Sequence, residues 1–350
     1  MSLQDFQERI RAAAGGGAPL CLRGGGSKDF YGNEPRGEVL DTRGYAGVVS
    51  YEPTELVITA RCGTPLSELE SLLAGNQQCL PFEPPHFGPG ATFGGCIAAG
   101  LSGPRRASAG ALRDFVLGVK LVDGRGRELS FGGQVMKNVA GYDLTRLVAG
   151  SLGTLALIAE ASIKVLPVSA SELTLKLETS QDGALDAMNR CAGQPLPISA
   201  TAWHAGELRV RLSGAAAAVR AAAQKIGGVA LDGAQGFWAG IREHSDPFFS
   251  GDEPLWRLAV PSTCPALDLP GRLLIEWGGG LRWLKSDAEP RKLREAAQRA
   301  GGHATLFRAA DKACGVFTAL DPALARLHRE LKAAFDPASV LNPGRLYAEL

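Results

Sequence analysis

The sequence lacks an excess of charge of either sign and lacks long apolar runs. Its 350 residues include 37 Lys and Arg and 36 Asp and Glu, a formal net charge of +1, so electrostatics gives no reason to expect nucleic acid or an anionic membrane as a partner. No stretch has the length of apolar residues that a membrane span needs. Residues 1–17 are typical of a short amphipathic helix rather than a signal or transit peptide, and we therefore expect a cytoplasmic protein.

Metal-binding patterns are absent as well. The seven cysteines are dispersed, with no Cys-x-x-Cys pair and no cysteine–histidine spacing of the zinc-finger kind. We expect reduced, mostly buried thiols and neither a zinc nor an iron–sulfur site in this chain. No histidine stands within four residues of another, and a lone histidine is more often structural than catalytic, so the sequence assigns no catalytic residue. His86, which precedes a glycine-rich segment, is the first histidine to test.

Glycine, by contrast, is abundant, with 45 residues, about 13% of the chain against an average of about 7%. Residues 20–28, LCLRGGGSK, run from a predicted strand into three glycines, Ser27 and Lys28. The free backbone N–H groups of such a turn can hold a pyrophosphate, although consecutive glycines also form ordinary flexible turns. The spacing matches neither the P-loop pattern nor the G-x-G-x-x-G fingerprint of dinucleotide-binding folds.

The hydrophobic pattern divides the chain near residues 168 and 320. Up to residue 168 it predicts short strands alternating with helices, namely strands at 18–24, 47–53, 55–63 and 154–167, a hairpin at 114–131, and helices at 65–76 and 138–153. Beyond Pro167 it predicts antiparallel-type strands at 171–179, 207–214, 255–261, 272–279, 281–286 and 304–309, and helices at 215–228 and 290–302. This second part reads as a ferredoxin-like α+β layer. The last segment, 321–350, is predicted to be a helix and a tail that folds back onto the first part.

Two more glycine-rich segments follow the first. Gly88–Pro104, GPGATFGGCIAAGLSGP, combines six glycines with small residues, which lets the backbone approach a flat ring closely. Lys137–Ile158, KNVAGYDLTRLVAGSLGTLALI, is predicted to form a helix that stops at Gly150 or Gly153, followed by a strand that begins at Gly153 and Thr154. Three such segments in one domain, in this order, are hard to explain as turns alone.

These segments together resemble a known family. In order, RGGGS, GATFGGCIAAG, KNVAGYDLTRLVAGSLGTL and a C-terminal FDPASVLNPGR resemble FAD-linked oxidases of the vanillyl-alcohol oxidase type, whose FAD-binding domain is also called the p-cresol methylhydroxylase (PCMH) type. The resemblance covers residues 1–168 and the tail from about residue 334, and within the family the chain is similar to the FAD-binding E subunits of glycolate oxidase. It implies an α+β fold with a PCMH-type FAD-binding domain of two α+β subdomains at 1–168, a smaller ferredoxin-like cap at 169–320 and a returning tail at 321–350.

The resemblance also implies one FAD, held noncovalently because Ser27 stands where relatives with covalent flavin often carry His. Residues implied to hold the diphosphate are Gly24, Gly25, Gly26, Ser27 and Lys28, with Arg23 as a nearby positive charge. Residues implied to line the diphosphate and the isoalloxazine, or to follow around the ring, are Gly90, Thr92, Gly94, Gly95, Ala98, Ser102, Gly103 and Arg105. Ile158 is implied to contact the adenine side through its backbone, and Asn342 and Arg345 to close over the flavin.

The implied function is that of an FAD-binding subunit of a glycolate oxidase, or dehydrogenase, complex, which oxidises glycolate to glyoxylate and passes electrons to an iron–sulfur partner. The implied partners are a second FAD-linked oxidase subunit, an iron–sulfur subunit and a small 2-hydroxy acid, with the complex in the cytoplasm or at the inner face of the cell membrane. Two alternatives stay open. One is a self-sufficient FAD-dependent 2-hydroxy acid oxidoreductase, which needs a base and a substrate-binding Arg in the cap. The other is a structural subunit with a degenerate flavin site.

Overall fold

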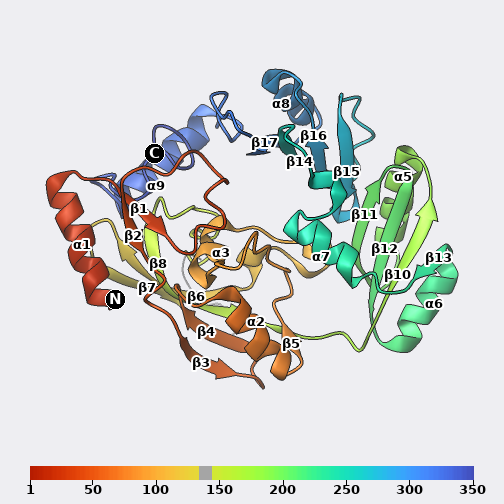
Figure 1. Ribbon diagram of the computed structural model, residues 1–350, viewed down its shortest axis with the longest axis horizontal. Helices are drawn as coiled ribbons and strands as arrows, with labels where there is room; N and C mark the ends of the chain where they lie inside the picture. Colours follow the sequence, from red (N-terminus) through yellow and green to blue (C-terminus); the bar gives the residue numbers. More distant parts are fainter. Residues whose placement is uncertain (134–143) are drawn as a thin grey trace.

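The computed structural model describes residues 1–133 and 144–350, and two large sheets stand apart from each other in it (Figure 1). The helices and strands before residue 168 are α1 (Leu3–Gly16), β1 (Leu20–Arg23), β2 (Glu38–Asp41), β3 (Val48–Glu52), β4 (Val57–Arg61), α2 (Leu66–Gly75), β5 (Gln78–Cys79), α3 (Phe93–Ala99), α4 (Arg106–Ala109), the 3-10 helix η1 (Leu112–Asp114), β6 (Val116–Asp123), β7 (Glu128–Gly132), β8 (Ala156–Lys164) and β9 (Leu166–Pro167).

The later elements form the second large sheet and its helices. They are β10 (Ser171–Glu178), α5 (Gln181–Ala192), β11 (Ile198–His204), β12 (Glu207–Gly214), α6 (Ala216–Ile226), β13 (Val229–Leu231), α7 (Gln235–Glu243), the 3-10 helix η2 (Pro247–Phe249), β14 (Leu255–Ala259), β15 (Arg272–Glu276), the 3-10 helix η3 (Trp277–Gly279), β16 (Leu281–Lys285), α8 (Pro290–Arg299), β17 (His303–Arg308) and α9 (Pro322–Phe335). The predicted boundaries at residues 168 and 320 stay predictions.

Local sequence explains the first helix. The Ser2 hydroxyl accepts a hydrogen bond from the Asp5 N–H, and the Asp5 carboxylate accepts one from the Ser2 N–H, which satisfies two free donors at the helix start. Phe6 and Ile10 lie one turn apart and are fully buried, and the helix ends at Gly17, which has a φ of +65°. The predicted amphipathic helix at the N-terminus is therefore confirmed.

The five-stranded sheet has the order β3-β4-β8-β6-β7 and is antiparallel throughout. Helix α2 buries Leu66, Leu69 and Leu73, and α3 buries Phe93 and Ile97 in the same hydrophobic core, which includes residues of β4, β6 and β8. The predicted strands, the hairpin at 114–131 and the helix at 65–76 are confirmed. Strand β2, which pairs in parallel with β1, was not predicted.

The predicted helix at 138–153 is wrong over the residues that can be compared. Its first part, residues 138–143, lies outside the described residues, and residues 144–153 form turns. Gly150, Leu152 and Gly153 have positive φ angles of 87°, 51° and 73°, which no α-helix contains. The following strand accordingly begins at Ala156 rather than at Thr154.

The second sheet has eight strands in the order β13-β10-β12-β11-β15-β16-β14-β17, and all of its neighbouring pairs are antiparallel. Helices α5 and α6 pack against one face of it, whereas α7 lies on the face toward the first sheet (Figure 1). All six strands predicted after Pro167 and both helices are present. Sequence patterns missed β11, β13, α5 and α7.

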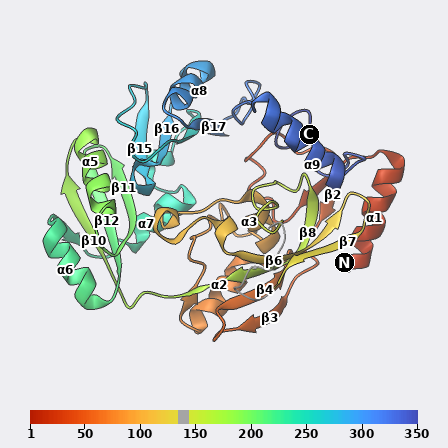
Figure 2. The same cartoon turned by 180° about the vertical axis from the view of Figure 1, so that it is seen from behind.

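The C-terminal segment returns to β1, at the same end of the molecule as α1 and β2 (Figures 1 and 2). The Leu20 N–H donates to the Val340 carbonyl at 2.7 Å, and the Asn342 N–H donates to the Leu20 carbonyl at 2.9 Å. Lys332 of α9 is 4% exposed, and its ammonium group donates to the Asp336 carboxylate and to the Thr154 and Leu341 carbonyls, each at 2.8 Å. A buried charge thus ties the tail to the loop before β8.

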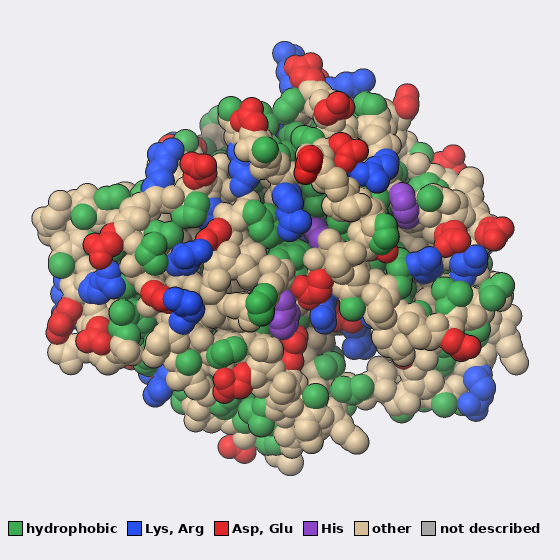
Figure 3. Space-filling view, in the orientation of Figure 1, with side chains coloured by type: hydrophobic (Ala, Val, Ile, Leu, Met, Phe, Trp, Pro, Cys, Tyr) green, Lys and Arg blue, Asp and Glu red, His purple; other side chains and the backbone are tan. Residues whose placement is uncertain are grey.

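The surface agrees with the near-neutral composition. Basic and acidic side chains are interspersed on the face shown in Figure 3. Among residues 1–133 and 144–350, no helix combines the length and the hydrophobicity that crossing a membrane requires. The seven cysteines are free thiols, and four of them, Cys21, Cys62, Cys96 and Cys264, are buried.

Replacing the buried lysine tests the attachment of the tail. Lys332→Met leaves the Asp336 carboxylate, which is 0% exposed, without its cation, so we expect the free energy of unfolding to fall by about 3–5 kcal/mol. Urea denaturation measures this change. Lys292→Met, at an exposed position of α8, is the control and should change stability by no more than about 0.5 kcal/mol. Equal stability of the two variants would contradict the role given to Lys332.

Candidate functional site

Four segments far apart in the sequence meet in two adjoining hollows that we call the glycine cleft. Both hollows are lined by the end of β1, by α3, by the turn before β8 and by the tail, through Leu22, Arg23, Gly24, Gly95, Ala98, Leu152 and Asn342. One hollow continues along the first glycine loop to Gly25, Gly26, Ser27 and Lys28, and to Arg345. The other reaches Gly94, Gly153 and Ile158. Gly24 and Ile158 therefore line the same hollow.

The glycines of the cleft are required first by the packing of the loops themselves. A Cβ atom on Gly25 would overlap the Gly90 carbonyl, and one on Gly24 would overlap the Thr92 hydroxyl. A Cβ atom on Gly94 would lie 2.5 Å from the Cβ atom of Cys62. A ligand is therefore not the only reason for glycine at these positions, because any side chain would collide with a neighbouring segment of the protein.

Gly95 differs from these glycines. It lies in α3, and an added Cβ atom would meet only the Thr92 hydroxyl oxygen, at 3.1 Å. The Gly95 N–H donates to that same oxygen, which caps the start of the helix. Since Gly95 lines both hollows, its missing side chain leaves space for a bound molecule rather than for another loop.

The glycine cleft carries more positive than negative charge. Arg23, Lys28 and Arg345 line it, and Asp29, which is 2.7 Å from the Arg23 guanidinium, is the one acidic residue among the described residues of its lining. Lys28 donates to the His86 carbonyl at 3.1 Å, and burial lowers the pKa of its ammonium group. Arg345 donates to the carbonyls of Asn33 and Asp29. Because two of the three cations are held by neutral carbonyls, the cleft suits an anionic ligand.

Asn342 fixes the relative positions of the cleft walls. Its side-chain oxygen accepts the Leu22 N–H at 2.6 Å, and its side-chain nitrogen donates to the Leu152 carbonyl at 2.6 Å. One side chain of the tail thus connects the end of β1 to the turn before β8. Asn342 itself has a φ of +42°, a conformation that asparagine tolerates better than most residues.

The remaining site residues predicted from sequence lie elsewhere. Gly90 packs against Gly25 and lines neither hollow of the cleft. Ser102 and Gly103 line a separate pocket described below. Arg105 lines neither this pocket nor the cleft, because its N–H donates to Glu83 at 2.9 Å and its guanidinium group lies 3.5 Å from the Ser169 hydroxyl. Residues 137–143 of the third glycine-rich segment lie outside the described residues.

The separate pocket, which we call the junction pocket, lies where the loop 85–104 meets the eight-stranded sheet. Its lining consists of Pro85, Phe87, Leu101, Ser102, Gly103, Pro104, Ile241, Arg242, His244, Arg257, Glu276, Leu281, Trp283 and Phe307. Residues close in sequence line the glycine cleft and this pocket, since Ala98 lines the cleft and Leu101 lines the pocket. The glycine cleft and the junction pocket are therefore neighbours at the C-terminal end of α3.

Glu276 is the most unusual group of the junction pocket. It is 3% exposed, and one carboxyl oxygen accepts the Trp283 indole N–H at 2.7 Å. The pKa of Glu276 is raised to about 7, chiefly by burial and to a smaller extent by the charge of Glu83, while the Trp283 hydrogen bond and the charges of Arg257 and Arg211 oppose the shift. Sequence patterns missed this residue. The signal was a glutamate inside the otherwise apolar strand of residues 272–279, where a charge must be buried.

The histidines are dispersed in the structure as in the sequence. His86 lines neither the glycine cleft nor the junction pocket, and its ring nitrogen lies 2.9 Å from the Glu70 carboxylate. His244 lines the junction pocket, where its ring stacks on Phe249 with centroids 3.9 Å apart. Burial lowers the pKa of His244 well below its usual value, so its ring is neutral. No sequence pattern distinguishes His244 from the other histidines.

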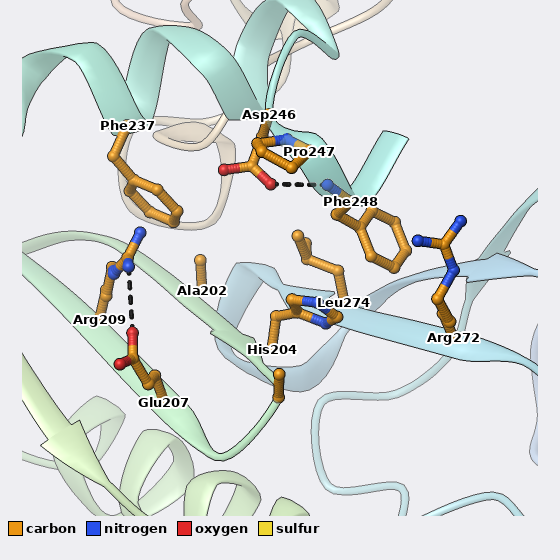
Figure 4. A pocket seen from close by; sticks show the side chains of 11 residues that line it. Ala202, His204, Glu207, Arg209, Phe237, Asp246, Pro247, Phe248, Arg272 and Leu274 are labelled. Carbon is orange, nitrogen blue, oxygen red and sulfur yellow. Dashed lines mark hydrogen bonds and ion pairs between the residues drawn. The ribbon is translucent and has the colours of Figure 1, made fainter. Parts of the chain in front are cut away.

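A further cavity of about 410 Å³ lies between α7, η2 and the strands β11, β12 and β15 (Figure 4). Its charged residues are already paired within the protein. Arg209 contacts Glu207 at 3.0 Å and lies 3.9 Å from the Phe237 ring, and Arg272 lies 3.1 Å from Glu253. The Asp246 carboxylate accepts the Phe248 N–H. This cavity therefore carries no unmatched charge that calls for a ligand.

Comparison with known proteins places the chain among flavin-dependent proteins. Residues 1–132 match the family model described as an FAD binding domain. The chain is 48% identical over 347 residues to the glycolate oxidase subunit GlcE of Escherichia coli, covering 99% of this chain and 98% of that protein. It is 33% identical over 186 residues to a D-lactate dehydrogenase of Archaeoglobus fulgidus, which covers 52% of this chain and 41% of that protein.

Two further likenesses extend this comparison. The chain is 33% identical over 160 residues to the glycolate oxidase subunit GlcD of Bacillus subtilis, covering 45% of this chain and 34% of that protein. A solved structure of alkyldihydroxyacetonephosphate synthase matches with a TM-score of 0.67 at 15% identity, covering 96% of this chain and 74% of that chain. The second likeness shows a shared fold.

The buried carboxyl group predicts a pH dependence of stability. Because the pKa of Glu276 in the folded protein, about 7, lies above the ordinary glutamate value of 4.5, the folded state binds this proton more tightly than the unfolded state. The stabilisation is complete below about pH 4 and is lost as the pH rises through 7, a change of about 3 kcal/mol. Glu276→Gln should therefore gain about 3 kcal/mol relative to the wild type between pH 4 and pH 8.

Urea denaturation at both pH values measures this gain, since Gln keeps the oxygen that accepts the Trp283 N–H. Glu330→Gln, at an exposed position of α9 paired with Arg326, is the matched control and should follow the wild type. The same pH dependence in Glu276→Gln and in the wild type would refute the argument.

Proposed function

This chain belongs to the family of FAD-binding glycolate oxidase subunits, and on that premise we propose that its glycine cleft holds one FAD without a covalent bond. The chain is thus an FAD-dependent oxidoreductase subunit. The observation that carries the proposal is the cleft itself, in which closely packed glycine loops are lined by three cations and one carboxylate. A diphosphate matches that imbalance of charge.

The residues of the cleft fit the parts of FAD in one order. We assign the diphosphate to the N–H groups of Gly24–Gly26 and to Ser27, with Arg23, Lys28 and Arg345 supplying positive charge. The adenine side lies toward the backbone of Ile158, and the isoalloxazine lies along α3. Thr92, Gly94, Gly95 and Ala98 line that path, Ser102 and Gly103 stand at its end, and Asn342 holds the walls. Gly90 supports the loop from behind, and we assign no contact with FAD to Arg105.

The flavin, when bound, supplies the chemistry by accepting two electrons and a proton from the substrate. The chain binds and orients it. Buried residues around the end of α3, such as Leu101 and Trp283, exclude water from the side that faces the junction pocket.

We further propose that the chain works in a complex that oxidises glycolate to glyoxylate, together with a second FAD-linked oxidase subunit. Similarity to the glycolate oxidase subunit GlcE over nearly the whole chain supports this, and the partial similarity to a GlcD subunit supports an FAD-linked partner that is itself related. Electrons then pass to an iron–sulfur subunit. We place the iron–sulfur centres in that partner because the cysteines of this chain are dispersed, four of them buried.

One observation favours the alternative of a chain that oxidises a 2-hydroxy acid by itself. That alternative needs an arginine and an acid–base group in the cap, and the junction pocket contains Arg257 and Glu276. Bleaching of the flavin absorbance at 450 nm by glycolate distinguishes the two cases. If the chain acts alone, the isolated protein bleaches, and if the partner holds the reacting flavin, only the complex does. A purified chain that releases no FAD on denaturation would instead support a degenerate site.

Filling the cleft at Gly95 tests the proposed FAD site. Gly95→Val places a branched side chain where both hollows meet but where no loop packs, so we expect the affinity for FAD to fall at least tenfold, about 1.4 kcal/mol, with the fold retained. Flavin absorbance after dialysis and the dissociation constant of added FAD measure the effect. Gly236→Val is the matched control, because Gly236 is an exposed position of α7 where an added Cβ atom would have no described atom within 4 Å. Unchanged FAD binding by Gly95→Val would remove the cleft from the proposal.

The proposed complex predicts what accompanies the chain during purification. A tagged chain isolated from cells that express it at its natural level should bring down a second flavoprotein and an iron–sulfur protein in fixed proportion. Electron paramagnetic resonance of the purified complex should then show reduced iron–sulfur centres after glycolate is added. Flavin reduction without any iron–sulfur signal would show that the electrons leave by another route.

A further inference from the structure

The Glu243 carboxylate, at the end of α7, binds the backbone of the loop that leads into the second glycine-rich segment. Its Oε2 atom accepts the His86 N–H at 3.0 Å and the Phe87 N–H at 2.9 Å, and its Oε1 atom lies 2.7 Å from the Arg242 guanidinium group. Two successive backbone N–H groups that converge on one oxygen form a concave anion site. Through this contact, a helix of the second sheet holds a loop of the first part of the chain.

The loop needs such a partner because its backbone is strained. Phe87 has a φ of +53°, in the left-handed region that a bulky side chain seldom occupies. A strained residue keeps its conformation only where the surrounding contacts determine it. The Phe87 ring packs edge-on against Phe30 and His244, with centroids 5.4 and 5.0 Å away, and Glu243 holds the backbone. The conformation of this loop therefore depends on the second part of the chain.

One peptide group connects Glu243 to the glycine cleft. The N–H of Phe87 and the carbonyl of His86 belong to the same planar peptide, in which they point in opposite directions. The N–H donates to Glu243, and the carbonyl accepts a hydrogen bond from the Lys28 ammonium group at 3.1 Å. A rotation of this peptide that breaks one of these hydrogen bonds also breaks the other. His86, the first histidine to test from the sequence, thus contributes here through its backbone.

Lys28 has few other groups to hold it. Among residues 1–133 and 144–350, its ammonium group has no acidic side chain within 4 Å, and its other hydrogen bond is to the Ser27 hydroxyl oxygen at 3.5 Å. Burial lowers the pKa of Lys28, and the charges of Cys96 and Glu243 oppose that shift. Glu243 therefore supports both the position and the charge of this lysine without forming a direct ion pair with it.

We propose that Glu243 is a positioning residue of the FAD site, which acts on the cofactor through the peptide between His86 and Phe87 and then through Lys28. The inference rests on the proposed function, because Lys28 lines the glycine cleft, where we assign its charge to the diphosphate. Glu243 itself lines neither hollow of the cleft, so its effect is indirect. The inference gives the second part of the chain a share in FAD binding, although the family model matches residues 1–132.

A double-mutant cycle in the full chain tests this role. The flavin is removed, and titration with FAD, followed by flavin fluorescence, measures the dissociation constant. Glu243→Leu keeps the approximate size of the side chain but accepts no hydrogen bond, so we expect it to weaken FAD binding by about tenfold or more. In a Lys28→Met background the same substitution should weaken binding by less than about twofold, because its effect passes through Lys28. A merely structural role would weaken binding equally in both backgrounds.

Two matched variants accompany the cycle. Glu295→Leu is the control, because Glu295 of α8 also lies 2.7 Å from an arginine, Arg291, but is half-exposed and lines neither hollow of the cleft, so its FAD affinity should equal that of the wild type. Glu243→Gln keeps one acceptor oxygen for the loop and should recover part of the affinity, even if Glu243→Leu folds poorly. Equal FAD affinity of Glu243→Leu and Glu295→Leu would overturn the inference, as would a greater loss in Glu243→Leu than in Lys28→Met.

Hydrogen exchange of the same proteins without FAD gives a second readout. The amide groups of His86 and Phe87 should exchange faster in Glu243→Leu than in the wild type, and unchanged exchange would also overturn the inference. The wild type separates these results from the proposed function. A wild type that binds FAD no better than Glu243→Leu contradicts the positioning role alone. A wild type that binds no FAD contradicts the proposed function, and hydrogen exchange then still decides whether Glu243 holds the loop.

Discussion

The close approach of two glycine loops is the constraint on which the site depends. Gly25 lies so near the Gly90 carbonyl that no side chain fits between them, and Gly24 stands in the same relation to Thr92. At Gly25 main chain packs directly against main chain, and at Gly24 the neighbour is the Thr92 hydroxyl, so this part of the cleft wall has little freedom to change shape. Asn342 then holds that wall to the turn before β8, through hydrogen bonds to Leu22 and Leu152. A tail more than 300 residues distant in sequence thus completes the site formed by β1.

The glycine cleft and the junction pocket differ in the charge of the side chains that line them. In the glycine cleft, Lys28 and Arg345 donate to backbone carbonyls, which orient them without neutralising their charge. In the junction pocket the charge is reduced to one unmatched guanidinium group, since burial keeps Glu276 protonated to about pH 7. The first arrangement suits a doubly charged diphosphate. In both places, basic side chains have no carboxylate partner among the described residues.

Sequence reasoning succeeded where the signal is local. Alternating apolar residues identified β4, β10 and β12, and the glycine-rich segments identified most of the cleft, because each pattern is contained within one short stretch. It failed at residues 144–153, where apolar spacing fits a helix but Gly150 and Gly153 adopt positive φ angles. It also missed the junction pocket. Arg257, Glu276 and His244 come from β14, β15 and the end of α7, and only the register of the folded sheet brings them together.

The glycine cleft and the junction pocket meet at the C-terminal end of one short helix, α3, and this has a mechanical consequence. Residues 98–104 line the cleft with Ala98 and the pocket with Ser102 and Gly103, so a shift of α3 alters both hollows at once. The two parts of the chain are also fixed to each other nearby, because Lys312 donates to the carbonyls of Phe30 and Gly32, directly after the first glycine loop. A flavin that orders this loop therefore also orders the contact on which the junction pocket is built, which couples cofactor binding to the geometry of the second hollow.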